Sequence, residues 1–147
     1  ALVFCIGASW QYSHIAGAAE VLLAHLQDFV MTVQRLHVAQ RYSEIAISGH
    51  LVHLAGQLAE DTSLDIRGQT RQTLELIDRL LAEAGTDKSH IMSVMIFLKD
   101  IEQDYAAMNE IWDAWVADIE ALPRTCVEAK LYQPEVLVEM TVVAVKP

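Results

Sequence analysis

The chain has 147 residues, the length of one domain with a modest core, and it is too short for two. Apolar residues make up 53% and charged residues 20%, a composition that predicts a folded chain. Ten lysines and arginines stand against twenty aspartates and glutamates, which gives a formal net charge of −10. Because no run of basic residues offsets this balance, we expect no nucleic-acid partner.

Residues 1–30 differ from the rest of the chain. They contain no Lys or Arg, which argues against a secretory signal with its basic start. Polar residues interrupt the apolar ones, so we do not expect a membrane span. The apolar residues from Ile15 to Val30 recur at helical spacing and predict an amphipathic helix. This segment is either a native helix that covers a hydrophobic surface or a leader outside the natural protein.

Apolar periodicity after residue 30 predicts a single mixed sheet backed by two helices, an α+β fold. Ser63 is the expected N-cap of the first helix, and Gly85 is expected to end it. The expected elements are a strand at 32–38, a hairpin of 44–48 and 51–55, a helix from 64 or 65, a strand at 91–98, a helical stripe from 101 to 119, and a hairpin of 124–131 and 136–145. The strand at 91–98 is almost continuously apolar, which predicts cover on both faces.

Residues 122–131 read Leu-Pro-Arg-Thr-Cys-Val-Glu-Ala-Lys-Leu and are the most informative stretch. With period two, Arg124, Cys126 and Glu128 share one face of a strand. A guanidinium is poorly suited to a core and well suited to gripping a planar carboxylate. The alternative is a solvated edge, where an ion pair of Arg124 with Glu128 or Glu139 would contribute under about 1 kcal/mol.

Glu139 lies in the last predicted strand, on the same face as Leu137 and Thr141. The apolar residues around it predict a partly buried carboxylate, which serves either chemistry or a structural salt bridge. A simple hairpin around Gln133-Pro134 would place Glu128 opposite Glu139.

The two cysteines, Cys5 and Cys126, form no disulfide framework and lack metal-ligand spacing, so a reducing cytoplasm is expected. Cys126 has no histidine within its motif to activate it as a nucleophile. His50 and His53 would lie on opposite faces of a strand and make a poor metal pair. We predict no metal.

Several short motifs occur in a fixed order along the chain. They are Tyr42-Ser43, Leu54-Ala55-Gly56-Gln57, Gly-Gln-Thr-Arg-Gln-Thr-Leu at 68–74, Leu-Ala-Glu-Ala-Gly at 81–85, Phe-Leu-Lys-Asp at 97–100, Met-Asn-Glu-Ile-Trp at 108–112, Pro-Arg-Thr-Cys-Val-Glu at 123–128, and Val138-Glu139. In order and spacing the set resembles the Rid family of reactive-intermediate deaminases, also called the YjgF family, over about residues 31–146. This resemblance implies a domain at 31–147 after an extension at 1–30. It also implies a chorismate-mutase-like fold of the AroH type and a homotrimer with sites in the clefts between subunits.

The resemblance assigns Arg124 to the substrate carboxylate and Glu139 to the attacking water. It assigns the backbone at Cys126 to holding substrate or water. Four further residues match positions that line the family site: Tyr42, Asn109, Gly56 and Ala55. Ala55 stands where the family often has serine, so the pocket lacks one hydroxyl donor. Tyr42 has an alternative role as an interface aromatic, and Asn109 as a helix-surface amide.

The resemblance implies an enzyme that needs no cofactor. The expected reaction is hydrolytic deamination of 2-imino and enamine acids, such as 2-aminoacrylate and 2-iminopropionate, to 2-keto acids and ammonia. The alternative is a non-catalytic sensor or regulatory protein that binds small carboxylates in the same cleft. Ribonuclease activity is attributed to some relatives, but the acidic charge disfavours it here.

Overall fold

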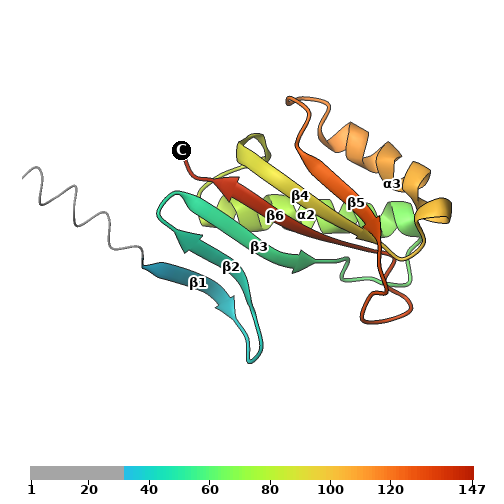
Figure 1. Cartoon of the computed structure of the whole chain (residues 1–147), viewed down its shortest axis with the longest axis horizontal. Helices are drawn as coiled ribbons and strands as arrows, with labels where there is room; N and C mark the ends of the chain where they lie inside the picture. The colour runs from blue at the N-terminus through green and yellow to red at the C-terminus, as the bar shows by residue number, and fades with distance from the viewer. Residues whose placement is uncertain (1–31) are drawn as a thin grey trace, which may run out of the picture. The chain divides into compact units, whose positions relative to one another are not determined.

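The computed structural model describes residues 32–147, and the helix predicted within residues 1–30 lies outside them. The unit Val33–Pro147 holds a six-stranded mixed sheet with both long helices on one face, which confirms the predicted fold class (Figure 1). Its elements are β1 (Val33–Val38), β2 (Ser43–Ser48), β3 (Leu51–Gln57), α2 (Ile66–Ala84), the 3₁₀ turn η1 (Lys88–His90), β4 (Ile91–Leu98), α3 (Ile101–Trp115), β5 (Arg124–Glu128) and β6 (Val138–Val145). Within these residues, no helix has the length and hydropathy of a membrane-spanning segment.

The strand order is β1-β2-β3-β6-β4-β5, and the predicted hairpin between the last two strands is wrong. β6 pairs antiparallel with both β3 and β4, while β5 pairs parallel with β4 after the α3 crossover. The physical reason lies in the side chains. Every second residue of β6 is buried, which suits a central strand, whereas β5 carries Arg124, Thr125 and Glu128 and suits an edge.

Helix α2 buries one stripe of residues and ends at Gly85 as predicted, but its N-cap is Asp65 instead of Ser63. The Asp65 carboxylate accepts a hydrogen bond of 2.9 Å from the Gly68 N–H. The Ser63 hydroxyl is engaged elsewhere and donates to Asp61 over 2.6 Å. At the other end, Gly85 adopts φ 82°, a left-handed conformation that closes the helix.

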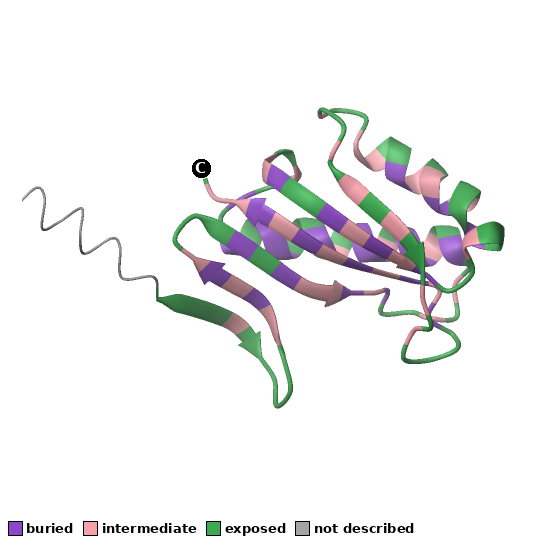
Figure 2. Ribbon diagram, viewed as in Figure 1, coloured by how far each residue is buried: buried purple, intermediate pink, exposed green. Residues whose placement is uncertain are grey.

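The core lies between the sheet and the helices and includes Val94, Ile96, Val138 and Met140. β4 was predicted to be covered on both faces, yet among residues 32–147 only its helix side is covered, as the alternation along β4 and β6 shows (Figure 2). We call the side away from the helices the open face. Phe97 is half-buried there, because residues 32–147 form no second layer over it.

The helical stripe predicted over residues 101–119 is only partly correct. α3 ends at Trp115, so Ile119 lies beyond it. Met108 and Trp112 of this stripe are buried against the core. Tyr105 is exposed, whereas the side chain of the preceding residue, Asp104, is buried.

Replacing Asp65 with Ala should lower the free energy of unfolding by about 1 kcal/mol, because the cap on the first turn of α2 is lost. Urea unfolding monitored by circular dichroism measures this change. Ser63→Ala is the control and should have less effect, since Ser63 caps no helix. An equal loss in both variants would contradict the assignment.

Candidate functional site

Arg124 is the first residue of β5, and its register places it on the helix side of the sheet. It lies opposite Val94 of β4, a residue buried against the helices. Its Nη2 donates a 2.7 Å hydrogen bond to Asn109 Oδ1 of α3. The guanidinium carbon lies 4.9 Å from the centre of the Trp112 ring, so the buried indole supports the plane of the fork.

The partners of this guanidinium are neutral. Within residues 32–147, no carboxylate is close enough to Arg124 to form an ion pair, so the predicted alternative of pairing with Glu128 or Glu139 is wrong. Glu128 instead accepts from the N–H of Ile101 at the start of α3, over 3.1 Å. An arginine has five N–H donors, and here one donates to Asn109 while another makes a long contact of 4.0 Å with the Met108 sulfur. The half-buried guanidinium therefore retains donors for an anionic ligand.

Cys126 lies on the same face as Arg124, two residues further along β5, and is half-buried. Burial raises the pKa of its thiol above the ordinary value, and the nearby Arg124 charge opposes this effect only in part. The thiol is thus protonated at neutral pH, which disfavours nucleophilic catalysis as the sequence predicted. Arg124, Met108, Asn109, Trp112 and Cys126 together are called the Arg124 cluster below.

A β-bulge in β3 shapes the second group of predicted residues. Leu54 pairs with Val142 and Gln57 with Met140, so two residues of β3, 55 and 56, stand opposite one residue of β6. The buried Gln57 side chain donates to the Ala55 carbonyl over 3.1 Å and braces the bulge. Bulges commonly re-aim side chains beside functional sites.

Gly56 is required at this bulge because the side chain of Glu139 lies across its backbone. A Cβ at residue 56 would overlap Glu139 Oε1 and stand 2.8 Å from the carboxyl carbon. Only glycine leaves this space free. The Gly56-Gln57 motif is thus explained physically: Gly56 leaves space for the Glu139 carboxylate, and Gln57 braces the bulge.

Glu139 borders a cleft of about 660 Å³, which we call the Glu139 cleft. Three other predicted residues, Tyr42, Ala55 and Gly56, also line it. Further lining residues that sequence reasoning missed come from β2, the loop after β3, α2 and the β5–β6 loop, and the charged or aromatic ones are Glu44, Glu60, Arg79 and Tyr132. No sequence motif marks them, because they meet only through the folding of four distant segments.

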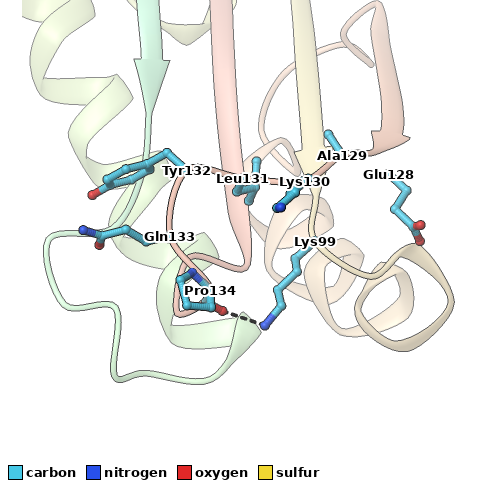
Figure 3. Close-up of a pocket in the computed structure, with 8 residues that line it drawn as sticks. All are labelled: Lys99, Glu128, Ala129, Lys130, Leu131, Tyr132, Gln133 and Pro134. Atoms are coloured by element: carbon cyan, nitrogen blue, oxygen red, sulfur yellow. Dashed lines mark hydrogen bonds between the residues drawn. The ribbon is translucent and has the colours of Figure 1, made fainter.

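A neighbouring cleft of about 580 Å³ lies between Lys99, which follows β4, and residues 128–134 at the end of β5 and in the β5–β6 loop (Figure 3). Tyr132 borders both clefts. Lys99 reaches across this second cleft and donates to the Pro134 carbonyl over 2.6 Å, and none of the predicted site residues lines this cleft. We therefore place the candidate chemistry at the Glu139 cleft and the Arg124 cluster.

These two groups of residues lie on opposite faces of the sheet. Arg124 is opposite Val94, which is opposite Val142, and all three point toward the helices. Glu139 is opposite Phe97 and points to the open face. Because direct neighbours across strands share a face and alternate residues do not, one chain cannot bring its own Arg124 and Glu139 together.

Comparisons with known proteins agree with this architecture. A solved structure of a protein from Pseudomonas aeruginosa is 44% identical, with a TM-score of 0.75, and covers 79% of this chain and 100% of that one. A YjgF family member from Neisseria meningitidis is 42% identical, with a TM-score of 0.76 and coverages of 80% and 97%. A RutC family protein of Haemophilus influenzae is 43% identical over 115 residues, which are 78% of this chain and 98% of the relative.

The fold is therefore that of the YjgF proteins, a mixed sheet with two helices on one face. The sequence pattern that defines the family described as Endoribonuclease L-PSP matches residues 32–146. The chain belongs to this family, which includes the YjgF and RutC proteins.

Gly56→Ala should displace the Glu139 carboxylate and lower the free energy of unfolding by roughly 1 kcal/mol through overpacking. In a Glu139→Ala background the same change should cost almost nothing, because the obstructing side chain is gone. A double-mutant cycle by urea unfolding measures this coupling. Equal costs in the two backgrounds would disprove the proposed contact.

In a Cys5→Ser chain, Cys126 should react with iodoacetamide at neutral pH more slowly than the thiol of the urea-unfolded chain. The native pKa is raised, so fewer thiolates are present at any given pH, and the stability linked to the buried thiol is lost as pH rises through that pKa. Alkylation followed by mass spectrometry across a pH series checks this. Rapid modification of the folded protein at neutral pH would contradict it.

Proposed function

We propose that the protein hydrolyses 2-imino acids, and the enamines that tautomerise to them, to 2-keto acids and ammonia. A water oxygen adds to the imine carbon, the carbon–nitrogen bond of the resulting tetrahedral adduct breaks, and nitrogen leaves as ammonia. The oxygen stays as the keto group, so no electrons are exchanged with a cofactor. One observation carries the proposal: the guanidinium of Arg124 is hydrogen-bonded to a neutral amide, and the carboxylate of Glu139 borders a cleft.

Arg124 would bind the carboxylate of the substrate. Its fork matches two carboxylate oxygens, and the contacts with Asn109 and Trp112 fix its plane before any ligand arrives. An anchored carboxylate holds the imine carbon in one position, which makes the attack effectively intramolecular.

Glu139 would position the water and accept its proton, and it would return that proton to the departing nitrogen. General-base catalysis requires hydrogen-bond reach of the water, and Gly56 leaves the Glu139 carboxylate room beside the cleft. The thiol of Cys126 has no role in this scheme, because its raised pKa keeps it protonated. The backbone of Cys126 remains available to hold the substrate.

The active unit would be a homotrimer with each site between two copies. One chain presents its two groups on opposite faces, so a complete site needs Arg124 from one copy and Glu139 from its neighbour. The open face supplies a reason for association, since Val127 is exposed there opposite the half-buried Phe97, and Leu51 is exposed at the other end of the same face.

Cleavage of RNA, which the family description suggests, fits this chain less well. Twenty acidic residues against ten basic ones repel a polyphosphate. The Glu139 cleft itself carries Glu44 and Glu60 in addition to Glu139.

Mixing two inactive variants tests the proposal. Arg124→Ala and Glu139→Gln should each abolish the acceleration of 2-iminopropionate decay. Co-expressed trimers should regain roughly one quarter of the wild-type activity, because random mixing leaves one intact site in each mixed ring. The imine is generated in situ by an amino-acid oxidase, and its lifetime is measured by trapping as a semicarbazone.

Glu102→Gln, an exposed site on α3, serves as the control and should keep full activity. Circular dichroism and native mass spectrometry verify that each variant folds and assembles. Full activity of Arg124→Ala alone would refute the role of the guanidinium. Binding of a 2-keto acid without faster imine decay would instead indicate a sensor of small carboxylates.

A further inference from the structure

The Glu139 cleft has a charge distribution and a size that bear on the choice of substrate. We propose that it selects 2-imino acids whose side chain is longer than that of alanine and either neutral or positively charged, and that it rejects dicarboxylic ones. This inference rests on the function proposed above and names the substrate class of that same site.

Size is the first observation. The cleft of a single chain measures about 660 Å³, which leaves room beside Glu139 for a side chain longer than a methyl group after a neighbouring copy contributes its Arg124. Beyond Glu139 its wall includes Leu58 and Ala59 after β3 and Leu76 of α2. These apolar groups can pack against the methylene groups of a longer side chain, and a three-carbon substrate would leave them in water.

Charge is the second observation. Three carboxylates line the cleft, those of Glu44, Glu60 and Glu139, and Glu44 is half-buried. Among the described lining residues the cleft has one cation, Arg79 of α2. Arg79 is paired with Glu60 across 3.4 Å, so a carboxylate of the same cleft offsets part of its charge.

The carboxylate shared by all 2-imino acids would be bound by Arg124 of the neighbouring copy. The remainder of the substrate then meets Glu44 and the Glu60–Arg79 pair, a surface with excess negative charge. A second carboxylate would be repelled by Glu44, whereas a guanidinium or an apolar group would not. The cleft would thus discriminate against dicarboxylic imino acids through repulsion between their second carboxylate and Glu44.

A competing arrangement makes the opposite prediction. Arg79 could leave Glu60 and bind a distal carboxylate, since this ion pair is long and both of its side chains are exposed. The cleft would then favour dicarboxylic substrates, and Arg79→Gln would remove that preference. Comparing substrates of different charge therefore separates the two arrangements.

The experiment measures kcat/KM for the imino acids of leucine, arginine and glutamate, each generated in situ by an oxidase or dehydrogenase of matching specificity. The wild-type protein should process the leucine and arginine derivatives at least about tenfold better than the glutamate derivative, as expected for one unscreened repulsion. Glu44→Gln should raise kcat/KM for the glutamate derivative and narrow the ratio. Added salt should narrow it too, because the repulsion is screened.

Glu102→Gln makes the same change in net charge outside the cleft and should leave the ratio unaltered. A preference for the glutamate derivative that Arg79→Gln abolishes would overturn the inference, and so would a ratio that Glu44→Gln does not change. If no imine decays faster, the proposed reaction has failed. The charge preference is then judged from calorimetric binding of the three corresponding 2-keto acids, where tight binding of 2-ketoglutarate alone would refute it.

Discussion

The alternation of side chains across a pleated sheet is the constraint on which the arrangement of this protein depends. Arg124 and Glu139 are fifteen positions apart in sequence, and β4 separates their strands by a single neighbour. The register nevertheless turns one toward the helices and the other toward the open face. Strand pairing cannot be shifted by one residue without exposing the buried side of β6, so this separation is fixed by the same hydrophobic pattern that builds the core.

The position of Glu139 is secured from both sides. Before β6, the buried amide of Gln69 donates to the carbonyls of Thr62, Leu64 and Glu135, and its oxygen accepts from the Leu137 N–H over 2.9 Å. This one side chain therefore connects the start of α2 to the backbone two residues ahead of Glu139. Beside β6, the bulge at Gly56 provides the space in which the carboxylate lies. Within residues 32–147, these backbone contacts and no ion pair of Glu139 position the segment that carries the carboxylate.

The sequence was sufficient to predict most elements and some of the residues in each of the two groups. Period-two and period-3.6 patterns identified the strands around Gly49 and the inward stripe of α2, because each burial pattern is local. The order of the strands in the sheet, in contrast, does not follow from local sequence patterns. Gln133-Pro134 suggested a hairpin, and nothing in that segment indicated that β4 would intervene. The choice between Ser63 and Asp65 as N-cap was decided by a single backbone hydrogen bond.

At the candidate site, too, some features could be predicted from the sequence and others could not. Arg124 was recognisable by its chemistry, but its stacking on Trp112 was not, since a tryptophan at helical spacing is usually a core residue and this one is buried as well. The Glu139 cleft joins β2, β3, α2 and β6. Glu44 and Arg79 carry no motif, so only their meeting in space reveals that they share a cavity. The placement of Arg124 and Glu139 on opposite faces likewise needed the register of β4.

Net charge and local charge act in opposite directions at this site. A chain with a formal charge of −10 repels small carboxylates at long range, although physiological salt confines that repulsion to about 8 Å from the surface. Recognition of the proposed anionic substrate would then come from contact, and Arg124 is suited to this because its partners, Asn109 and Trp112, carry no negative charge. A carboxylate that reaches the fork gains two charge-assisted hydrogen bonds in a partly desolvated place, where they are stronger than in water. In the proposed scheme, the acidic surroundings would disfavour anions elsewhere on the cleft and leave Arg124 as the group that binds the substrate carboxylate.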